Sequence, residues 1–374
     1  MEADKHCLDK RWRKALRAAA AVGLASALAL APAAQACTSF LLRTSDGGAV
    51  YGRTMEFGFQ LTSDAIVIPR RFAFTATGPG GKPGLVWAAK YGAVGLNAFG
   101  APVLTDGMNE KGLAGGILYF PDYAGYVDPA TTDPATAMAP WEFLTWALTS
   151  FATVAEVKDA LPGVHIIDVV EPNLGVAPPF HYTLHDASGA SIVIEPVKGE
   201  LKIYDNPFGV MTNSPEFDWH LTNLRNYVKL SPVNAAPLAI DGQTISPLGQ
   251  GSGLLGIPGD PTPPSRFIRA LGLAISAKRV PGGDESVRLA EHILNNFDIP
   301  RGFVKPGAGD HGPLEFTQWS TVAELTTKKY YVKTYEDQVL RGIDLMSFDL
   351  DAKMVASAPL KPRLAPPPLA FGKP

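Results

Sequence analysis

Cysteine is nearly absent from this chain of 374 residues, which contains only Cys7 and Cys37. The sequence also has no G-x-S-x-G segment and no Walker-type lysine motif, which excludes the usual serine α/β-hydrolase and P-loop nucleotide enzymes. Beyond the first 20 residues it has no run of basic residues, and its net charge is −3. A mildly acidic chain of this kind is a poor candidate for binding nucleic acid.

The first 36 residues have the pattern of a secretory signal peptide. An Ala/Leu-rich stretch at residues 18–31 follows a basic segment, and Ala34-Gln35-Ala36 has the small-x-small form of a cleavage site. The apolar stretch is too short for a comfortable membrane span. We therefore expect a secreted or periplasmic protein that begins at Cys37 and is not inserted in the membrane after cleavage. Removing six basic and three acidic residues changes the net charge from −3 to −6.

Cleavage at this point would leave Cys37 as the single cysteine and as the first residue of the chain. One cysteine cannot form an internal disulfide, so its thiol must be buried, lipidated or reactive. An N-terminal cysteine brings two reactive groups together, because the thiolate can attack a carbonyl and the α-amine can act as a base near neutral pH. The sequence therefore points to Cys37 as a nucleophile.

Apolar and β-branched runs joined by short turns dominate the chain and predict strands. Residues 38–43 and 49–53 read as a hairpin, as do 180–185 and 190–196, and further strands are expected at 65–69, 85–91, 112–120, 316–322 and 329–334. Helices are expected from Pro140, from the capping box Thr153/Glu156, over 217–228, from Thr262-Pro263, and around Leu289–Phe297. This order favours an α+β fold of two layered antiparallel sheets with helices outside.

Two other motifs are weak. Gly251-Ser252-Gly253-Leu254-Leu255-Gly256 matches G-x-G-x-x-G, but it follows no convincing strand and Pro258 prevents a helix after it, so we expect a loop. His181 and His185 share one face of a predicted strand without a cysteine or carboxylate cluster nearby. They read as hydrogen-bonded polar residues and not as metal ligands.

The predicted first hairpin brings Arg53 and Glu56 back beside Cys37. A reactive cysteine needs a cation that favours the thiolate, and an N-terminal amine needs a group that holds it. Arg53 can supply the cation and Glu56 the carboxylate. An ordinary ion pair at a strand edge explains the same two residues equally well on spacing alone.

Several spaced segments resemble the choloylglycine hydrolase family, which contains bile salt hydrolases and penicillin V acylases. The resemblance covers most of residues 37–335, in segments that occur in the family's order. These are Cys37-Thr38-Ser39-Phe40, Gly52–Phe57, Asp106–Leu113, Met211–Pro215 with Phe217–His220, Leu248–Gly251, and Ile257–Asp260 through Ser265-Arg266-Phe267.

The resemblance implies the αββα sandwich of N-terminal-nucleophile hydrolases and a role for each matching position. Cys37 matches the nucleophile and Arg53 the arginine that contacts its thiol. Asn213 matches a side-chain donor to the oxyanion, and Arg266 matches a second active-site arginine. Glu56 stands where the family usually has Asp to hold the α-amine. Glu keeps the charge but is one methylene longer.

Tyr119 occupies a position where bile salt hydrolases have Asn and penicillin V acylases tend to have Tyr. The resemblance implies that its backbone N–H is the second oxyanion donor and that its ring shapes the acyl pocket. A core aromatic at a strand end is the plainer interpretation. The segment 175–182 also resembles the acylases, while loops 57–64 and 121–139 are expected to decide acyl specificity.

We therefore expect an enzyme that hydrolyses a linear amide C–N bond of a small acyl-amide substrate through an acyl-thioester, similar to penicillin V acylase. Bile salt hydrolase and N-acyl homoserine lactone acylase are the alternatives. A lipoprotein binding module acylated at Cys37 is the non-enzyme alternative, although Ala34 stands where lipidation normally needs Leu. No cofactor or metal is expected, and the resemblance suggests a homotetramer. The expected domains are a signal peptide at 1–36, a catalytic domain at 37–360 and a disordered Pro-rich tail at 361–374.

Overall fold

A computed structural model describes residues 36–305 and 314–361. The predicted signal peptide, apart from Ala36, and the predicted tail, apart from Lys361, lie outside the described residues. No helix of the described part of the chain is long and apolar enough to cross a membrane.

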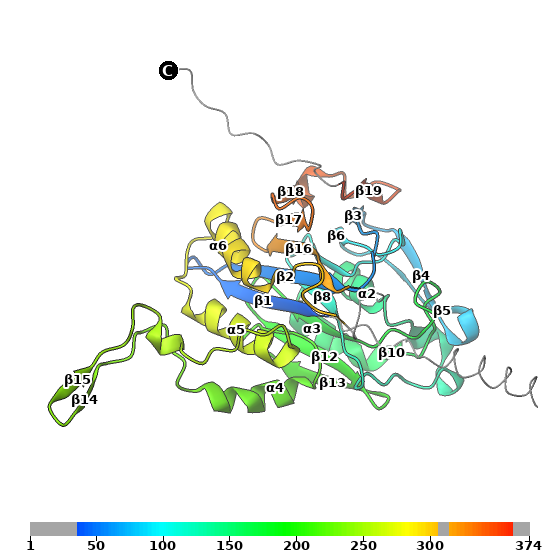
Figure 1. Cartoon of the computed structure of the whole chain (residues 1–374). Helices are drawn as coiled ribbons and strands as arrows, with labels where there is room; N and C mark the ends of the chain where they lie inside the picture. Colours follow the sequence, from blue (N-terminus) through cyan, green and yellow to red (C-terminus); the bar gives the residue numbers. More distant parts are fainter. Residues whose placement is uncertain (1–35, 306–313, 362–374) are drawn as a thin grey trace, which may run out of the picture.

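Two antiparallel sheets form the centre of the molecule (Figure 1). The five-stranded sheet has the order β1 (Cys37–Arg43), β2 (Ala49–Phe57), β16 (Phe316–Glu324), β17 (Lys329–Thr334) and β18 (Arg341–Asp344). The eight-stranded sheet has the order β13 (Glu200–Asp205), β12 (Ser191–Val197), β11 (Phe180–His185), β8 (Ala114–Tyr119), β7 (Asp106–Asn109), β6 (Ala93–Leu96), β3 (Asp64–Ile68) and β19 (Ala356–Pro359).

Three two-stranded sheets contain the other strands of the described residues. They pair β4 (Ala73–Thr77) with β5 (Pro83–Ala88), β9 (Ala137–Met138) with β10 (His165–Ile166), and β14 (Leu238–Ile240) with β15 (Gln243–Ile245). The β14–β15 hairpin projects away from the body of the molecule (Figure 1). The predicted strand at 85–91 is β5, so it lies in a small sheet and not in a main one.

The first hairpin forms as predicted and sets the geometry of the site. The turn residue Gly47 adopts φ +88°, a left-handed conformation that glycine adopts without strain. Thr44 N–H donates to Gly48 O at 2.9 Å and closes the turn. The resulting register places Cys37 opposite Met55 and Ser39 opposite Arg53. The segment Gly52–Phe57 is thereby fixed beside Cys37.

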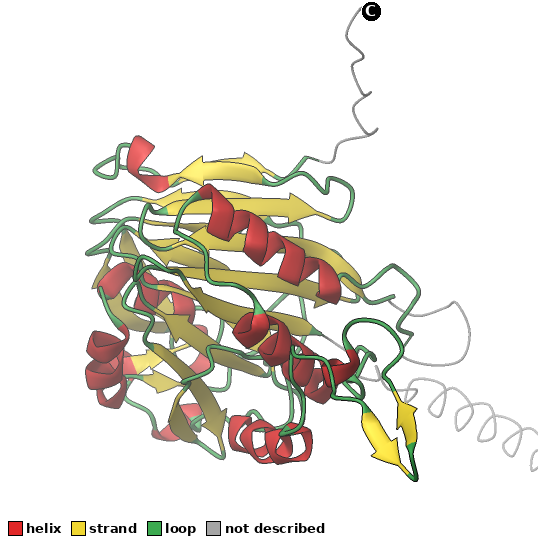
Figure 2. Ribbon diagram, turned by 90° about the vertical axis from the view of Figure 1, so that its left-hand side faces the viewer, coloured by secondary structure: helices red, strands yellow, loops and turns green. Residues whose placement is uncertain are grey.

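Helices cover the outer faces of the two sheets (Figure 2). α5 (Pro263–Ser276) packs against β1, and α6 (Asp284–Leu294) packs against β2 and β16. α2 (Phe143–Ser150) packs against β7 and β8 of the other sheet. α3 (Val154–Ala160) and α4 (Phe217–Asn223) are shorter. The layering is therefore helix, sheet, sheet, helix, which confirms the expected two-sheet architecture.

Two separate apolar cores lie on the opposite faces of the eight-stranded sheet, because the side chains of each strand point alternately to one face and the other. In β8, Leu118 belongs to the core shared with the five-stranded sheet, whereas Ile117 joins the core under α2. In β12, Val193 and Ile194 divide in the same way. Successive side chains of a strand point to opposite faces, so each central strand supplies both cores.

Local contacts shift some of the predicted boundaries. The helix expected from Pro140 begins at Phe143, because the Glu142 carboxylate accepts hydrogen bonds from Thr77 N–H at 3.0 Å and from Ala139 N–H at 2.8 Å. These contacts fix residues 139–142 as a turn. The helix expected over 217–228 ends at Asn223 and continues as a 3₁₀ turn to Tyr227. The G-x-G-x-x-G segment lies in a loop, as predicted, with one 3₁₀ turn at Ser252–Leu254.

Candidate active site

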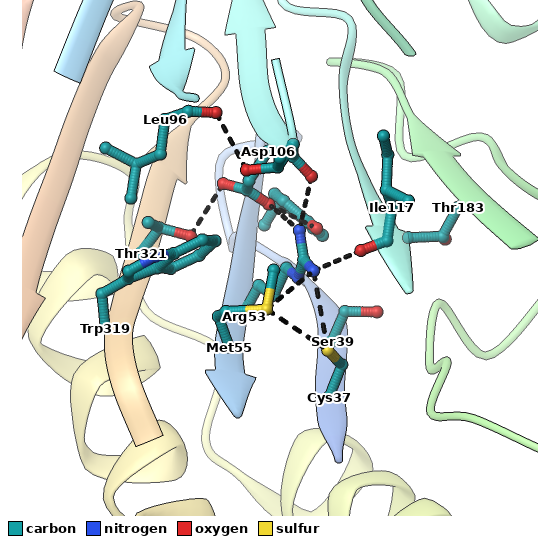
Figure 3. A network of polar contacts seen from close by, with 12 residues as sticks. Cys37, Ser39, Arg53, Met55, Leu96, Asp106, Ile117, Thr183, Trp319 and Thr321 are labelled. Atoms are coloured by element: carbon teal, nitrogen blue, oxygen red, sulfur yellow. Dashed lines mark hydrogen bonds and ion pairs between the residues drawn. The ribbon is translucent and has the colours of Figure 1, made fainter. Parts of the chain in front are cut away.

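Cys37 begins β1 and is only 2% exposed, between the two sheets. Its Sγ lies 3.6 Å from Arg53 Nη2 and 3.8 Å from Met55 Sδ (Figure 3). Burial raises the pKa of the thiol, and the Glu56 carboxylate adds to this, against the opposing effect of Arg53 and Arg266. The resting group is therefore a thiol, and it needs a base to become a nucleophile.

Arg53 crosses from β2 to the facing sheet and is fully buried. Its Nη1 donates to Thr105 O at 2.6 Å and lies 3.5 Å from Asp106 Oδ2, while Nη2 donates to Ile117 O (Figure 3). Its guanidinium carbon also lies 5.3 Å from the centre of the Trp319 ring. Burial alone would lower the pKa of Arg53, but the negative groups around it raise the pKa overall. Arg53 is thus a permanent cation aimed at the sulfur.

Asp106 anchors this arginine, a role that the sequence analysis did not assign. Its carboxylate accepts hydrogen bonds from Tyr51 at 2.9 Å, Thr321 at 2.8 Å and Tyr330 at 2.5 Å. Asp106 is the first residue of the segment Asp106–Leu113, which resembles the family. The sequence therefore marked the position of Asp106 but did not indicate that Arg53 is its partner. Gly116 leaves room for the arginine, because a Cβ there would lie 2.8 Å from Arg53 Nη1.

The side chain of Asn213 contacts the backbone nitrogen of Cys37. The Asn213 Oδ1 accepts from Cys37 N–H at 2.8 Å and from Arg266 Nη2 at 2.6 Å, and Nδ2 donates to Tyr119 O at 2.8 Å. One hydrogen of the Nδ2 amide group is used in this way, and an amide carries two. The second hydrogen is the one that the predicted oxyanion role requires.

The backbone N–H of Tyr119 points toward the same region. Phe120 N–H donates to Pro179 O on the β11 side of the strand, so alternation turns the N–H and C=O of Tyr119 to the other side. That side carries Asn213, which bonds the Tyr119 carbonyl, and Arg53, which bonds the Ile117 carbonyl. The geometry is compatible with two oxyanion donors from Asn213 and Tyr119.

Arg266 is fully buried on α5 and holds the start of β1. Its Nη1 donates to Cys37 O and, at 2.8 Å, to Thr38 Oγ1, while Nε donates to Pro261 O at 2.8 Å. Burial lowers the pKa of Arg266 despite nearby negative groups, which include Glu56 and Glu315. Glu315 is a second buried carboxylate that sequence reasoning missed.

Glu56 is also fully buried, and burial raises its pKa to about 8. Its Oε1 accepts from Thr317 Oγ1 at 2.8 Å, whereas Oε2 has no partner among the described residues. In this chain, which still carries Ala36, the nitrogen of Cys37 donates to Asn213 and not to Glu56. The role of Glu56 toward a free α-amine stays a prediction.

An apolar cavity of about 130 Å³ lies next to the nucleophile. Met55, which touches the Cys37 sulfur, lines it together with Phe57, Leu61, Phe99, Trp141 and Phe180. Phe57 and Leu61 belong to the predicted specificity loop 57–64. Tyr119 acts indirectly, since its ring packs edge-on against Phe57 and Phe180, with ring centres 6.2 and 6.3 Å away.

Two imidazoles support the Asn213 segment from behind. His181 Nε2 lies 3.0 Å from Thr212 O, and its Nδ1 lies 3.2 Å from Glu195 Oε1. His220 Nε2 lies 2.9 Å from Asn213 O, and burial lowers its pKa to about 4. His181 is therefore a hydrogen-bonded polar residue, as expected. Within the described residues, no group of three His, Cys, Asp or Glu side chains is arranged to hold a metal ion.

Comparisons with known proteins agree with this geometry. Residues 37–357 match the family model of linear amide C–N hydrolases, choloylglycine hydrolase family. A bile salt hydrolase/transferase of Clostridium perfringens is 36% identical over 85% of this chain and 95% of its own length. A penicillin V acylase of Pectobacterium atrosepticum is 28% identical, over 91% of this chain and 88% of its own.

Solved structures give the same result. A variant of the conjugated bile acid hydrolase of Clostridium perfringens superposes with a TM-score of 0.78 at 34% identity, over 88% of this chain and 99% of that one. Penicillin V acylase from Agrobacterium tumefaciens superposes with a TM-score of 0.72 at 25% identity, over 87% of this chain and 92% of that one. The fold is thus the αββα fold of N-terminal-nucleophile hydrolases. The chain belongs to the choloylglycine hydrolase family and is a linear amide C–N hydrolase.

Proposed function

We propose that Cys37 is the nucleophile of an amidase that acts on N-acyl amines whose acyl group is a single ring or a short chain. The observation that carries this proposal is the position of the thiol, which lies between a fixed guanidinium and an apolar cavity. The Cys37 thiolate attacks the amide carbon of the substrate, and the amine part of the substrate leaves with a proton. Water then hydrolyses the thioester between Cys37 and the acyl group. The α-amine freed by removal of residues 1–36 takes the thiol proton.

The size of the cavity supports a small acyl group. A cavity of about 130 Å³ is close to the ~150 Å³ engineered cavities that bind one benzene molecule. Its aromatic walls suit a phenoxyacetyl group or a short fatty chain. A rigid four-ring steroid needs more room than this, unless the loop at 57–64 moves.

The bile salt hydrolase alternative is supported by the 36% identity to the Clostridium perfringens protein. N-acyl homoserine lactones are a third class, since a flexible acyl chain fits the same cavity. The test is a side-by-side assay of penicillin V, an N-acyl homoserine lactone and glycocholate with one purified protein. We expect the first or second to have the highest kcat/KM, and glycocholate as the best substrate would overturn the assignment of the acyl group.

The nucleophile is tested separately. Cys37→Ala should abolish activity on every amide while the protein still folds, and Cys37→Ser should leave a weak enzyme, because a hydroxyl ionises far less than a thiol. Activity near wild type in Cys37→Ala would remove Cys37 from the mechanism. The intact mass of the exported protein distinguishes a free Cys37 from a lipidated one.

The proposal includes export and self-association. The pattern of residues 1–36 supports a secreted or periplasmic location, which fractionation of cells would test. A homotetramer is supported by the resemblance and by the β14–β15 hairpin, where Leu238, Ile240 and Ile245 are about half exposed. Light scattering on the purified protein measures the oligomeric state directly.

A further inference from the structure

The peptide bond between Ala36 and Cys37 is held on both sides by buried groups. Ala36 is 6% exposed, and its carbonyl accepts a hydrogen bond of 3.0 Å from Glu56 N–H. Its own N–H donates to the Glu315 carboxylate. The next nitrogen, that of Cys37, donates to Asn213. The site of predicted cleavage is therefore enclosed by Glu56 of β2 and by Glu315, which directly precedes β16.

Each of these two carboxylates has one oxygen that lacks a partner. Glu56 Oε2 and Glu315 Oε1 are buried and have no hydrogen-bond partner at bonding distance within residues 36–305 and 314–361, although the Thr54 hydroxyl lies near enough to lower the pKa of Glu56. Glu56 is fully buried and Glu315 is 3% exposed. A buried polar atom without a partner is costly, by roughly 1–3 kcal/mol and more when it is charged. The two free oxygens indicate that this pocket is built for a donor that the uncleaved chain does not supply.

The charges of the site point to a cation. Arg53 is paired with Asp106, which leaves Arg266 of α5 as the cation facing both Glu56 and Glu315. The negative charge of Asp260 also raises the pKa of Arg266. If both carboxyls were ionised against one guanidinium, an excess negative charge would lie in a buried place. Burial accordingly raises the pKa of Glu56 to about 8 and that of Glu315 to about 7, so the uncleaved chain keeps protons on these acids near neutral pH.

We propose that Glu315 is a second carboxylate of the amine site, and that Glu56 and Glu315 together hold the α-ammonium of Cys37 once residues 1–36 are released. Release turns the amide nitrogen of Cys37 into an ammonium and removes Ala36, whose N–H bonds Glu315 in the uncleaved chain. The added positive charge allows both carboxyls to ionise without leaving an excess negative charge. The new N–H groups supply donors for the two free oxygens, while Asn213 keeps its contact with the same nitrogen.

The consequence for the chemistry rests on the proposed function, in which the amine takes the thiol proton. The S–H bond breaks, an N–H bond forms, and the electron pair stays on sulfur as the thiolate. Glu315 stabilises the ammonium side of this transfer. A negative charge at Glu315 also makes the first proton of the thiol–ammonium pair harder to lose, so that this proton leaves at a higher pH.

The test uses the alkylation of Cys37 by iodoacetamide as a function of pH, because the processed chain has no other cysteine. In Glu315→Gln we expect the midpoint of the alkylation profile to fall by more than about 0.5 pH unit, since a nearby negative charge has been removed. Glu315→Asp should restore the midpoint. Glu200→Gln, which makes the same change of charge on the exposed strand β13, is the matched control and should leave it unchanged.

An unchanged midpoint in folded Glu315→Gln would overturn the proposal, as would an equal shift in the control. If Glu315→Gln does not fold, the α-amine pKa of the processed Cys37→Ala protein decides. The proposal requires a value above the ordinary ~7.7–8.0 of an α-amine, and a lower value rejects it. Alkylation needs no substrate, so these results are independent of the amidase assay. Loss of the proposed function would appear as a wild-type protein without amidase activity.

Discussion

Asn213 accepts a hydrogen bond of 2.8 Å from the backbone nitrogen of Cys37, although 176 residues separate the two in the chain. The same side chain donates to Tyr119 O and accepts from Arg266. Both donors to Oδ1 are N–H groups and the acceptor from Nδ2 is a carbonyl, so the orientation of the amide is determined. The oxygen of Asn213 therefore holds the backbone of Cys37, and its nitrogen keeps one hydrogen for the oxyanion role that we predict.

Replacing Asn213 by Ala should lower kcat by ~10²–10³, the usual cost of losing one oxyanion donor, with a smaller change in KM. Asn213→Asp separates the two functions, because it keeps an acceptor for the Cys37 nitrogen and loses the donor. We expect Asn213→Asp to be as impaired as Asn213→Ala. The exposed Asn226→Ala is the control. A pure KM effect, or an active Asn213→Asp enzyme, would reassign Asn213 to positioning alone.

Gly116→Ala should displace Arg53 without changing any charged residue. A Cβ at this position would lie 2.5 Å from Tyr51 Oη and 2.8 Å from Arg53 Nη1. We expect a loss of about 1–3 kcal/mol in the free energy of unfolding, as for other overpacked cores, together with slower alkylation of Cys37. Gly163→Ala is the control, because a Cβ there meets no atom within 4 Å. Alkylation at the wild-type rate would show that Arg53 does not need this space.

Sequence reasoning found the part of the site that is local in the chain. Arg53 and Glu56 lie in the strand that follows a tight turn, so the hairpin pattern alone brought them beside Cys37. Asn213 and Arg266 are distant in sequence, and only the resemblance indicated them. Periodicity reports which face of an element is apolar, but it does not report which elements meet.

Asp106 and Glu315 show the same limit for buried charge. Asp106 begins a strand and Glu315 directly precedes one. The residues next to each acid in the sequence do not indicate that its side chain is buried. Their partners, Arg53 and Arg266, come from other elements. The start of α2 was misplaced for a related reason, because Glu142 is held by Thr77, a residue from the distant strand β4.

His220 should make folding sensitive to acid. Its pKa falls to about 4 in the folded protein, chiefly because burial disfavours the charged ring, against about 6.5 in the unfolded chain. Between these values the unfolded chain binds a proton that the folded chain excludes. Stability is therefore fully present above pH 6.5 and decreases as the pH falls toward 4, by about 3 kcal/mol in total. Urea unfolding at pH 7 and pH 4.5 measures the decrease.

The variant His220→Gln can still donate to Asn213 O but does not titrate. It should lose less stability than the wild type between the same two pH values, while His185, which is also buried, contributes equally to both proteins. An identical loss in wild type and variant would mean that His220 is not the group responsible.

The two buried glutamates should make the uncleaved chain sensitive to high pH, with the opposite sign. The folded pKa values of Glu56, about 8, and Glu315, about 7, lie above the ordinary value of 4.5. The folded uncleaved chain keeps protons that the unfolded chain releases, so its stability falls as the pH rises from about 5 to 8. A free ammonium at residue 37 favours the charged carboxylates and should reduce this fall.

The measurement compares two chains that both carry Cys37→Ala, one beginning at Gln35 and one at residue 37. Urea unfolding at pH 5 and pH 8 gives the change in stability of each. We expect the longer chain to lose at least about 1 kcal/mol more than the shorter one over this interval. Replacing Glu56 and Glu315 by Gln in the longer chain should abolish its excess loss, because neither side chain then titrates. Parallel profiles for the two chains would mean that the new amine does not meet the glutamates, and the cation for their free oxygens would have to come from the substrate.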